Sequence, residues 1–276
     1  MTSIGMPALA PTLGAPSDAV ESLRVKGHAV VRGLADPDEI AEFRPLLTAA
    51  AEARRYDRRP LEARDTYGKA FVQSANLWQH DSGSKAFVHA PRFARVAAEL
   101  LGVDGVRLYH DQALFKEPHG GHTPWHQDQF YWPLDTEKVV TAWIALDEIG
   151  DDVGSMTFAS GSHLDGDLRG REISDQSEAE FAQLVAAKGF PLDTHGAMAA
   201  GDATFHSGWT LHRADPNPTD LMRPAMTIIY FADGARVTAP DSPFQQFDQA
   251  MWLQDCEPGD RAAGPLNPVL WPTPVS

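Results

Sequence analysis

The spacing of apolar residues predicts helices in the first third of the chain. Apolar residues recur every three or four positions between residues 40 and 50, as they do on the buried face of an amphipathic helix. The preceding Asp36-Pro37-Asp38-Glu39 supplies an N-cap, a first-turn proline and a capping-box glutamate. We therefore expect a helix from Asp36 to about residue 54. A second helix is expected over Pro91–Leu101 and should end at Gly102.

The remainder of the chain is dominated by short apolar runs that are typical of strands. A first strand is expected over Val25–Leu34, and one further helix over Gln176–Lys188, which should stop at Gly189. After Gly102 the apolar runs are separated by Gly, Asp and Pro turns. The strands expected there are Val106–His110, Ala113–Phe115, Val139–Leu146, Met156–Ala159, Ala203–His206 and Pro224–Phe231.

This order of elements favours an α+β or β-sandwich domain with helices packed outside. No repeat and no linker divides the sequence, so we expect a single domain over residues 1–276. Within it, residues 1–17 are expected to form a loose arm and residues 257–276 a Pro-rich extended tail. The run Ala53–Asp65 contains five arginines and is interpreted as a solvated connection.

The overall charge narrows the classes of partner. The chain contains 23 Lys and Arg against 38 Asp and Glu, a net charge of −15. Nucleic acids and anionic membranes are bound through clustered basic residues, so neither is expected as a partner. No apolar run approaches the roughly 20 residues of a membrane-spanning helix, and the N-terminus lacks the pattern of a secretion signal. Cys256 is the only cysteine, which excludes an internal disulfide, and we expect a cytoplasmic protein.

The sharpest candidate for chemistry is the segment Trp125-His126-Gln127-Asp128-Gln129. On a strand, residues two apart point to the same face, so the side chains of His126 and Asp128 are expected to lie together. One imidazole and one carboxylate form two thirds of the facial metal site of non-haem Fe(II) oxygenases. Such a site needs one more His from elsewhere in the chain.

A second segment supplies the missing parts. Residues 201–212 end at His212, and Arg223 follows eleven positions later. A strand with a His at its end and an Arg on the next strand would place a guanidinium beside the metal. Because Arg is suited to bidentate capture of a carboxylate, this combination indicates a carboxylate co-substrate that chelates the metal.

Together these segments resemble the phytanoyl-CoA dioxygenase family of Fe(II)- and 2-oxoglutarate-dependent oxygenases. The resemblance runs from about residue 23 to residue 232. It implies a mainly β fold, namely a double-stranded β-helix (a cupin-like jelly roll) with flanking α-helices. The motifs that carry it are Trp-His-Gln-Asp at 125–128, Thr-Ala-Trp at 141–143, the segment 154–163 that ends in Gly-Ser-His, Gly-Asp-Ala-Thr-Phe-His at 201–206, His212 and Arg223.

The resemblance also implies a role for individual residues. Arg223 would bind the distal carboxylate of 2-oxoglutarate, Trp143 matches a position beside that co-substrate, and Gln112 matches a position that often contacts it. At Arg213-Ala214 the family often has Gly-Ser, so this chain lacks one hydroxyl contact to the co-substrate. The iron ligands implied by the resemblance are His126, Asp128 and His212.

Other histidines are interpreted differently. His206 is the rival for the third metal ligand, but its place in the motif at 201–206 matches a structural position of the family. His163 is interpreted as a turn residue that fixes a loop, and Glu117–Thr123 as a mobile flap. The histidines that are candidates for the mouth of the site are His110, His119 and His122.

The expected activity is oxidation of an unactivated C–H bond of a small metabolite, with hydroxylation as the default outcome. The cofactor would be Fe(II), and 2-oxoglutarate and O2 would be converted to succinate and CO2. Asp128 argues against a halogenase, in which a small residue replaces the carboxylate ligand. Two alternatives remain: a zinc-dependent hydrolase, because two His and one carboxylate also suit Zn(II), and a non-catalytic binding protein with a vestigial metal site. The sequence leaves the substrate and the oligomeric state open.

Overall fold

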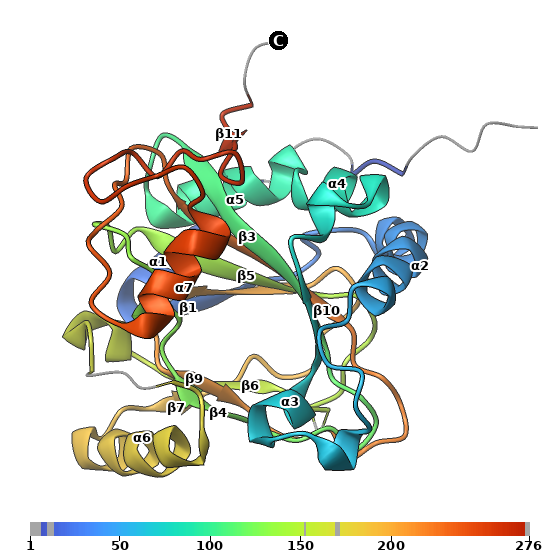
Figure 1. Ribbon diagram of the computed structural model, residues 1–276. Helices are drawn as coiled ribbons and strands as arrows, with labels where there is room; N and C mark the ends of the chain where they lie inside the picture. Colours follow the sequence, from blue (N-terminus) through green and yellow to red (C-terminus); the bar gives the residue numbers. More distant parts are fainter. Residues whose placement is uncertain (1–6, 10–13, 152, 169–171, 274–276) are drawn as a thin grey trace, which may run out of the picture.

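Two antiparallel sheets face each other in the computed structural model, which describes residues 7–9, 14–151, 153–168 and 172–273 (Figure 1). The larger sheet has the order β1 (His28–Val31), β8 (Ala203–Ser207), β5 (Val139–Ala145), β10 (Ala225–Ala232), β3 (Val106–Phe115) and β11 (Val269–Trp271), and β2 (Val72–Ala75) also pairs with β3. The smaller sheet has the order β4 (Thr123–His126), β9 (His212–Ala214), β6 (Met156–Ala159) and β7 (Leu192–Asp193). The strand pairs of both sheets are antiparallel, which confirms the expected mainly β jelly roll.

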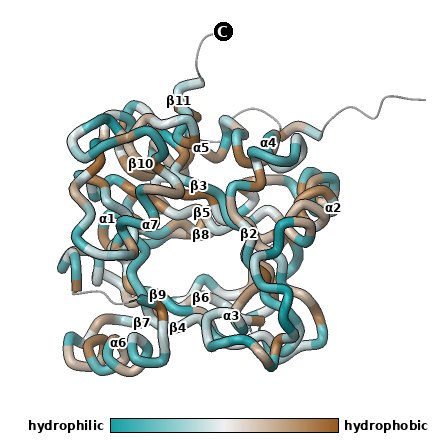
Figure 2. Tube along the Cα trace, viewed as in Figure 1, coloured by the Kyte–Doolittle hydropathy of each residue, from teal (hydrophilic) through white to brown (hydrophobic). Residues whose placement is uncertain are grey.

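Helices flank both sheets, as expected. The helices that contribute to the core behind the larger sheet are α1 (Ser17–Lys26), α2 (Pro37–Ala53), α4 (Ser82–Val88) and α5 (Pro91–Leu101). The smaller sheet is covered by α6 (Asp175–Lys188), and the remaining helices are α3 (Thr66–Ala70) and α7 (Pro243–Trp252). Hydrophobic residues gather where the helices meet the larger sheet, and the outer loops are mainly hydrophilic (Figure 2). In the described part of the chain, no helix is long and apolar enough to cross a membrane.

Several local predictions are confirmed by the backbone. The N-terminus of α2 carries the expected capping box, in which the side chain of Asp36 accepts from Asp38 N at 2.9 Å and Glu39 Oε2 accepts from Asp36 N at 2.8 Å. Helix α5 ends at Gly102, which has a φ of 64° as a left-handed C-cap requires. Strand β6 has the expected bounds, and α6 begins one residue earlier than expected.

Other boundaries differ from the prediction for identifiable reasons. Residues 25 and 26 belong to α1 and not to a strand, because the helix continues until Gly27 turns the chain with a φ of 83°. The two strands expected over residues 106–115 are one continuous strand, β3, which pairs along its length with β10 and β2. Helix α7 was not predicted, although Ser242 caps it, Pro243 opens it and its apolar residues recur at helical spacing.

Two segments, the run expected to be a solvated connection and the expected extended tail, are partly buried. In the arginine-rich run, Arg55 and Arg64 both form ion pairs with Glu117, at 2.7 and 2.5 Å, and the Arg64 side chain is only 2% exposed. In the Pro-rich segment 257–276, Leu270 is buried and β11 pairs with β3. The expected loose arm falls partly on residues 1–6 and 10–13, which lie outside the described residues.

Candidate metal centre and its cavity

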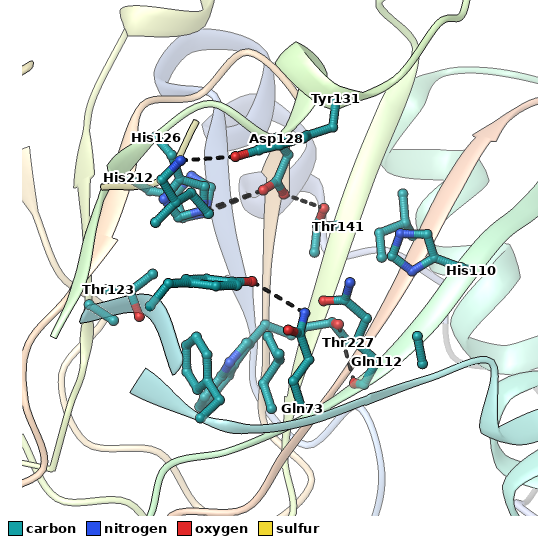
Figure 3. A pocket seen from close by; sticks show the side chains of 18 of the residues that line it. Gln73, His110, Gln112, Thr123, His126, Asp128, Tyr131, Thr141, His212 and Thr227 are labelled. Atoms are coloured by element: carbon teal, nitrogen blue, oxygen red, sulfur yellow. Dashed lines mark hydrogen bonds and ion pairs between the residues drawn. The ribbon is translucent and has the colours of Figure 1, made fainter. Parts of the chain in front are cut away.

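A cavity of about 760 Å³ lies between the two sheets. Most of its lining comes from the inner face of the larger sheet, the smaller sheet with the short helix that follows β4, residues 56–73, and α7. A cavity of this size is ordinary for a small-molecule site. Figure 3 shows His126, His212 and Asp128 converging on one side of it, with His110 and Gln112 facing them.

The structure brings His126, Asp128 and His212 together. The two histidines are paired across the smaller sheet, where β4 ends and β9 begins. Asp128 Oδ1 lies 3.5 Å from His126 Nε2 and 3.8 Å from His212 Nε2, and the three ligand atoms lie within 4.8 Å of one another. The expected strand ends at His126, and Asp128 opens a short 3-10 helix, Asp128–Tyr131. Gln127 between them is still extended, so the two side chains reach the same side as expected.

Hydrogen bonds to backbone carbonyls fix the orientation of both rings. His126 Nδ1 lies 2.8 Å from Pro124 O, and His212 Nδ1 lies 2.9 Å from Thr210 O. A ring nitrogen that bonds a carbonyl must carry the proton, so the other ring nitrogen, Nε2, keeps its lone pair free. Both Nε2 atoms face Asp128. This is the arrangement in which metal-binding imidazoles are usually held.

The two oxygens of Asp128 have different surroundings. Oδ1 faces the two histidines, whereas Oδ2 accepts from Thr141 Oγ1 at 2.8 Å and lies 3.1 Å from His206 Nε2. Burial opposes ionisation here, but the neighbouring imidazoles of His212, His126 and His206 outweigh it and hold the pKa of Asp128 well below its usual value. The structure therefore places His206 behind the carboxylate and leaves Oδ1 directed at the candidate metal position.

The donor set fits a divalent transition metal with open coordination positions. Two imidazole nitrogens and one carboxylate oxygen form a facial group of three, and the cavity lies on the side they leave free. His212 is buried and surrounded by other imidazoles, and these effects hold its pKa well below its usual value. A neutral imidazole is the form that binds a metal. Among the described residues, no other group of three His, Cys, Asp or Glu side chains is arranged in this way.

Arg223 presents a buried cation to the same cavity. It lies two residues before β10, and its guanidinium carbon is 5.0 Å from the centre of the Trp143 ring. Nη1 donates to Gly154 O at 2.6 Å, but Nε is buried without a partner, and no carboxylate of the described chain pairs with the guanidinium. Burial lowers the pKa of Arg223 to about 9. A desolvated cation with unused donors needs an anion, and the cavity is the place from which one can come.

The other residues expected at the co-substrate also line the cavity. Trp143 lies on β5 and Gln112 on β3, and both are part of the cavity wall. A neighbour that the sequence did not reveal is Lys116, whose side chain is fully buried beside Arg223 and donates to Gly121 O at 2.6 Å. Burial, together with the charge of Arg223, lowers the pKa of Lys116 to about 6.

The remaining histidines are separated by the fold. His110 lines the cavity, whereas His119 lies 3.0 Å from Asp220 on the surface, and neither His119 nor His122 is part of the cavity lining. His163 Nε2 lies 3.2 Å from Arg24 O, a contact that suits the expected role of fixing a loop. The segment expected as a flap is joined to its surroundings by backbone hydrogen bonds, including Gly121 N to Lys69 O at 2.8 Å.

Sequence comparison identifies relatives over most of the chain. The profile of the phytanoyl-CoA dioxygenase (PhyH) family matches residues 23–225. A probable alpha-ketoglutarate-dependent hypophosphite dioxygenase from Stutzerimonas stutzeri is 28% identical over 156 residues, which cover 54% of this chain and 53% of that protein. The chain therefore spans about half the length of this curated relative.

Solved structures resemble the whole fold. The non-heme alpha ketoglutarate dependent carbocyclase SnoK from nogalamycin biosynthesis superimposes with a TM-score of 0.73 and 26% identity, over 96% of this chain and 99% of that one. The non-heme alpha ketoglutarate dependent epimerase SnoN from the same biosynthesis gives a TM-score of 0.73 and 25% identity, over 92% and 97%. The two sheets and the outer helices thus form an architecture shared with these enzymes.

Proposed function

The chain belongs to the phytanoyl-CoA dioxygenase family, and from this membership we propose that it is an Fe(II)- and 2-oxoglutarate-dependent dioxygenase of small molecules. The observation that carries the proposal is the placement of a His126, Asp128 and His212 ligand group in one cavity with the unpaired guanidinium of Arg223. A metal site alone would suit several chemistries. A buried cation beside it is what a chelating dicarboxylate requires.

Each residue has a separate task in this proposal. His126, Asp128 and His212 would hold Fe(II) through Nε2, Oδ1 and Nε2, and Arg223 would hold the distal carboxylate of 2-oxoglutarate. Trp143 lies over the guanidinium and keeps water from it. The bound iron and 2-oxoglutarate supply the activation of O2, with release of succinate and CO2, and the protein positions the substrate C–H bond.

Hydroxylation of an unactivated C–H bond is the proposed outcome. Asp128 occupies the carboxylate position, so no place is left for a halide ligand at the metal. We further propose that residues 1–276 form one dioxygenase domain, because residues of both sheets line the same cavity.

Arg223 gives the test of this function. The purified protein should convert 2-oxoglutarate to succinate only with Fe(II), and Arg223→Ala should raise the KM for 2-oxoglutarate while leaving metal binding unchanged. Loss of one partner of a desolvated charge pair costs about 2–5 kcal/mol, so the KM should rise at least ~30-fold at ~1.4 kcal/mol per decade. The 2-oxoglutarate titration and the Fe(II) titration are both run on Arg223→Ala.

Arg213→Ala is the matched control. Arg213 also lines the cavity, but its guanidinium forms ion pairs with Glu178 and Asp215, at 3.3 and 3.6 Å. Its removal should leave the KM for 2-oxoglutarate within about threefold of the wild type, less than the tenfold that ~1.4 kcal/mol represents. An unchanged KM in Arg223→Ala, or equal damage to metal and 2-oxoglutarate binding, would contradict the proposal, as would succinate release driven by Zn(II).

A further inference from the structure

Helix α7 turns an apolar face toward the cavity. Residues at positions i, i+3, i+4, i+7 and i+8 of this helix share one side, and all five line the cavity: Phe244, Phe247, Asp248, Met251 and Trp252. Phe247 is 60% exposed and Met251 39% exposed, although both are large and apolar. A helix face that is apolar and only partly covered by the protein is suited to cover a ligand.

Asp248 places one carboxylate in the middle of this face. Its side chain is 7% exposed, and Oδ2 accepts from Tyr109 Oη at 3.0 Å. In the described part of the chain no Lys, Arg or His forms an ion pair with Asp248. Burial raises its pKa to about 7, although the neighbouring Tyr109 hydroxyl and Trp252 indole act to lower it. A buried carboxylate without a cation is costly, and a ligand cation would remove that cost.

Aromatic side chains flank the carboxylate along α7, with Phe244 four positions before Asp248 and Trp252 four positions after it. The ring of Trp252 lies 4.9 Å from that of His110, and the ring of Phe244 lies 5.7 Å from Phe130 and 5.9 Å from Tyr131. His110 Nδ1 is buried without a hydrogen-bond partner. A carboxylate flanked by aromatic side chains is a favourable environment for an ammonium group, which can gain both an ion pair and cation–π contacts.

The other charged residues of the cavity also favour a cationic ligand. Among the described lining residues, the acidic side chains not used by the metal centre are Asp65, Glu172 and Asp248. The basic ones are Arg223, which the proposed function assigns to the co-substrate, and Arg213, which pairs with Glu178 and Asp215. A polyanion such as a coenzyme A thioester would find no free cation there, whereas a ligand with a basic amine would find a free carboxylate.

We propose that the substrate is a compact, largely apolar ring compound with a basic amine, which packs on α7 and pairs its ammonium group with Asp248. This inference rests on the proposed function in one respect, since it takes the cavity beside the metal centre as the substrate site. The apolar rings would contact Phe244, Phe247 and Met251, and the amine would be held at the far side of the carboxylate from Tyr109.

Three anthracene probes that differ in one substituent test this inference. They are 9-(aminomethyl)anthracene, 9-anthracenemethanol and 9-anthracenecarboxylate, titrated by calorimetry at about pH 8 into protein loaded with Mn(II) and 2-oxoglutarate. We expect the amine to bind at least about tenfold more tightly than the alcohol, a difference of ~1.4 kcal/mol, and the carboxylate to bind most weakly. In Asp248→Asn the amine and the alcohol should bind equally, whereas Phe247→Ala should weaken all three probes alike.

The control for charge is Asp255→Asn, which removes one negative charge from an exposed residue that does not line this cavity. It should keep the preference for the amine. Equal binding of amine and alcohol to the wild type, no binding of any probe, or an unchanged preference in Asp248→Asn would overturn the inference. Mn(II) and 2-oxoglutarate binding are measured on the same preparations without a probe, so failure there would count against the proposed function and not against the role of Asp248.

Discussion

At the scale of single residues, the metal centre depends on how the Asp128 carboxylate is held. Its Oδ2 is engaged by Thr141 and His206, so only Oδ1 is left for a metal. Thr141 comes from the middle of β5 and His206 from the neighbouring β8, where the two residues face each other across the sheet. Two residues of the larger sheet thus orient Asp128, which lies in the segment that follows β4 of the smaller sheet.

Thr141→Val tests this orientation, because it removes the hydroxyl and keeps the shape. Loss of a hydrogen bond that orients a ligand typically costs 10- to 100-fold in metal affinity, so the Kd for Mn(II) should rise by about tenfold. The control is Thr227→Val in the same cavity, since Thr227 Oγ1 contacts only the backbone oxygen of Gln112, at 3.3 Å. If the two variants bind Mn(II) equally well, Thr141 does not position Asp128.

The sequence was informative about this site where the signal is local. His126 and Asp128 are two residues apart, and the order of His212 and Arg223 completes a recognisable pattern. Tertiary contacts between separate elements leave no such signal: Thr141 lies thirteen residues from Asp128, and Asp248 lies 139 residues from Tyr109. The latter pair belongs to a helix and a strand whose proximity exists only in the folded chain.

At the scale of elements, the helices with explicit start and stop residues were the predictable ones. Helices α2 and α5 follow a capping box or a first-turn proline, and α5 ends at Gly102. Helix α1 has no side-chain cap at Pro16, so the sequence carries no start signal for it, and the apolar pattern predicts its last residues as part of a strand. Boundaries that depend on tertiary pairing, such as the unbroken β3, could not be inferred from local composition.

Two glycines with left-handed backbones allow the conformational cost of adding a side chain to be measured separately from its steric cost. Gly201 (φ 89°) precedes β8, and a Cβ there would lie 2.0 Å from Ala35 O, whereas a Cβ at Gly102 (φ 64°) would meet nothing within 4 Å. Gly102→Ala should cost only the left-handed conformation, about 1–2 kcal/mol. Gly201→Ala should lower the free energy of unfolding by more than about 3 kcal/mol, because the backbone must also move. Urea unfolding of both variants decides this, and equal losses would contradict the steric argument.

At the scale of the whole molecule, burial of titratable groups couples the fold to pH. Burial is the main cause that lowers the pKa of four histidines, to about 3 for His28 and about 4 for His89, His110 and His195. They are neutral in the fold but bind protons below about pH 6.5 when the chain unfolds. Burial also raises the pKa of Asp111 and Asp248 to about 7. As the pH falls, these carboxyls bind protons in the folded state before they do in the unfolded chain. They therefore stabilise the fold as the pH falls, whereas the buried histidines destabilise it.

A single variant isolates one of these contributions. His195 Nε2 lies 3.0 Å from His28 Nδ1, and Gln at position 195 stays neutral while it can still hydrogen-bond to that ring. The wild type should lose stability through His195 as the pH falls from about 6.5 to about 4, with a slope of up to ~1.4 kcal/mol per pH unit for one group. His195→Gln should therefore show a shallower fall in the free energy of unfolding over this range. Parallel stability curves for wild type and His195→Gln would mean that His195 is not held neutral by burial.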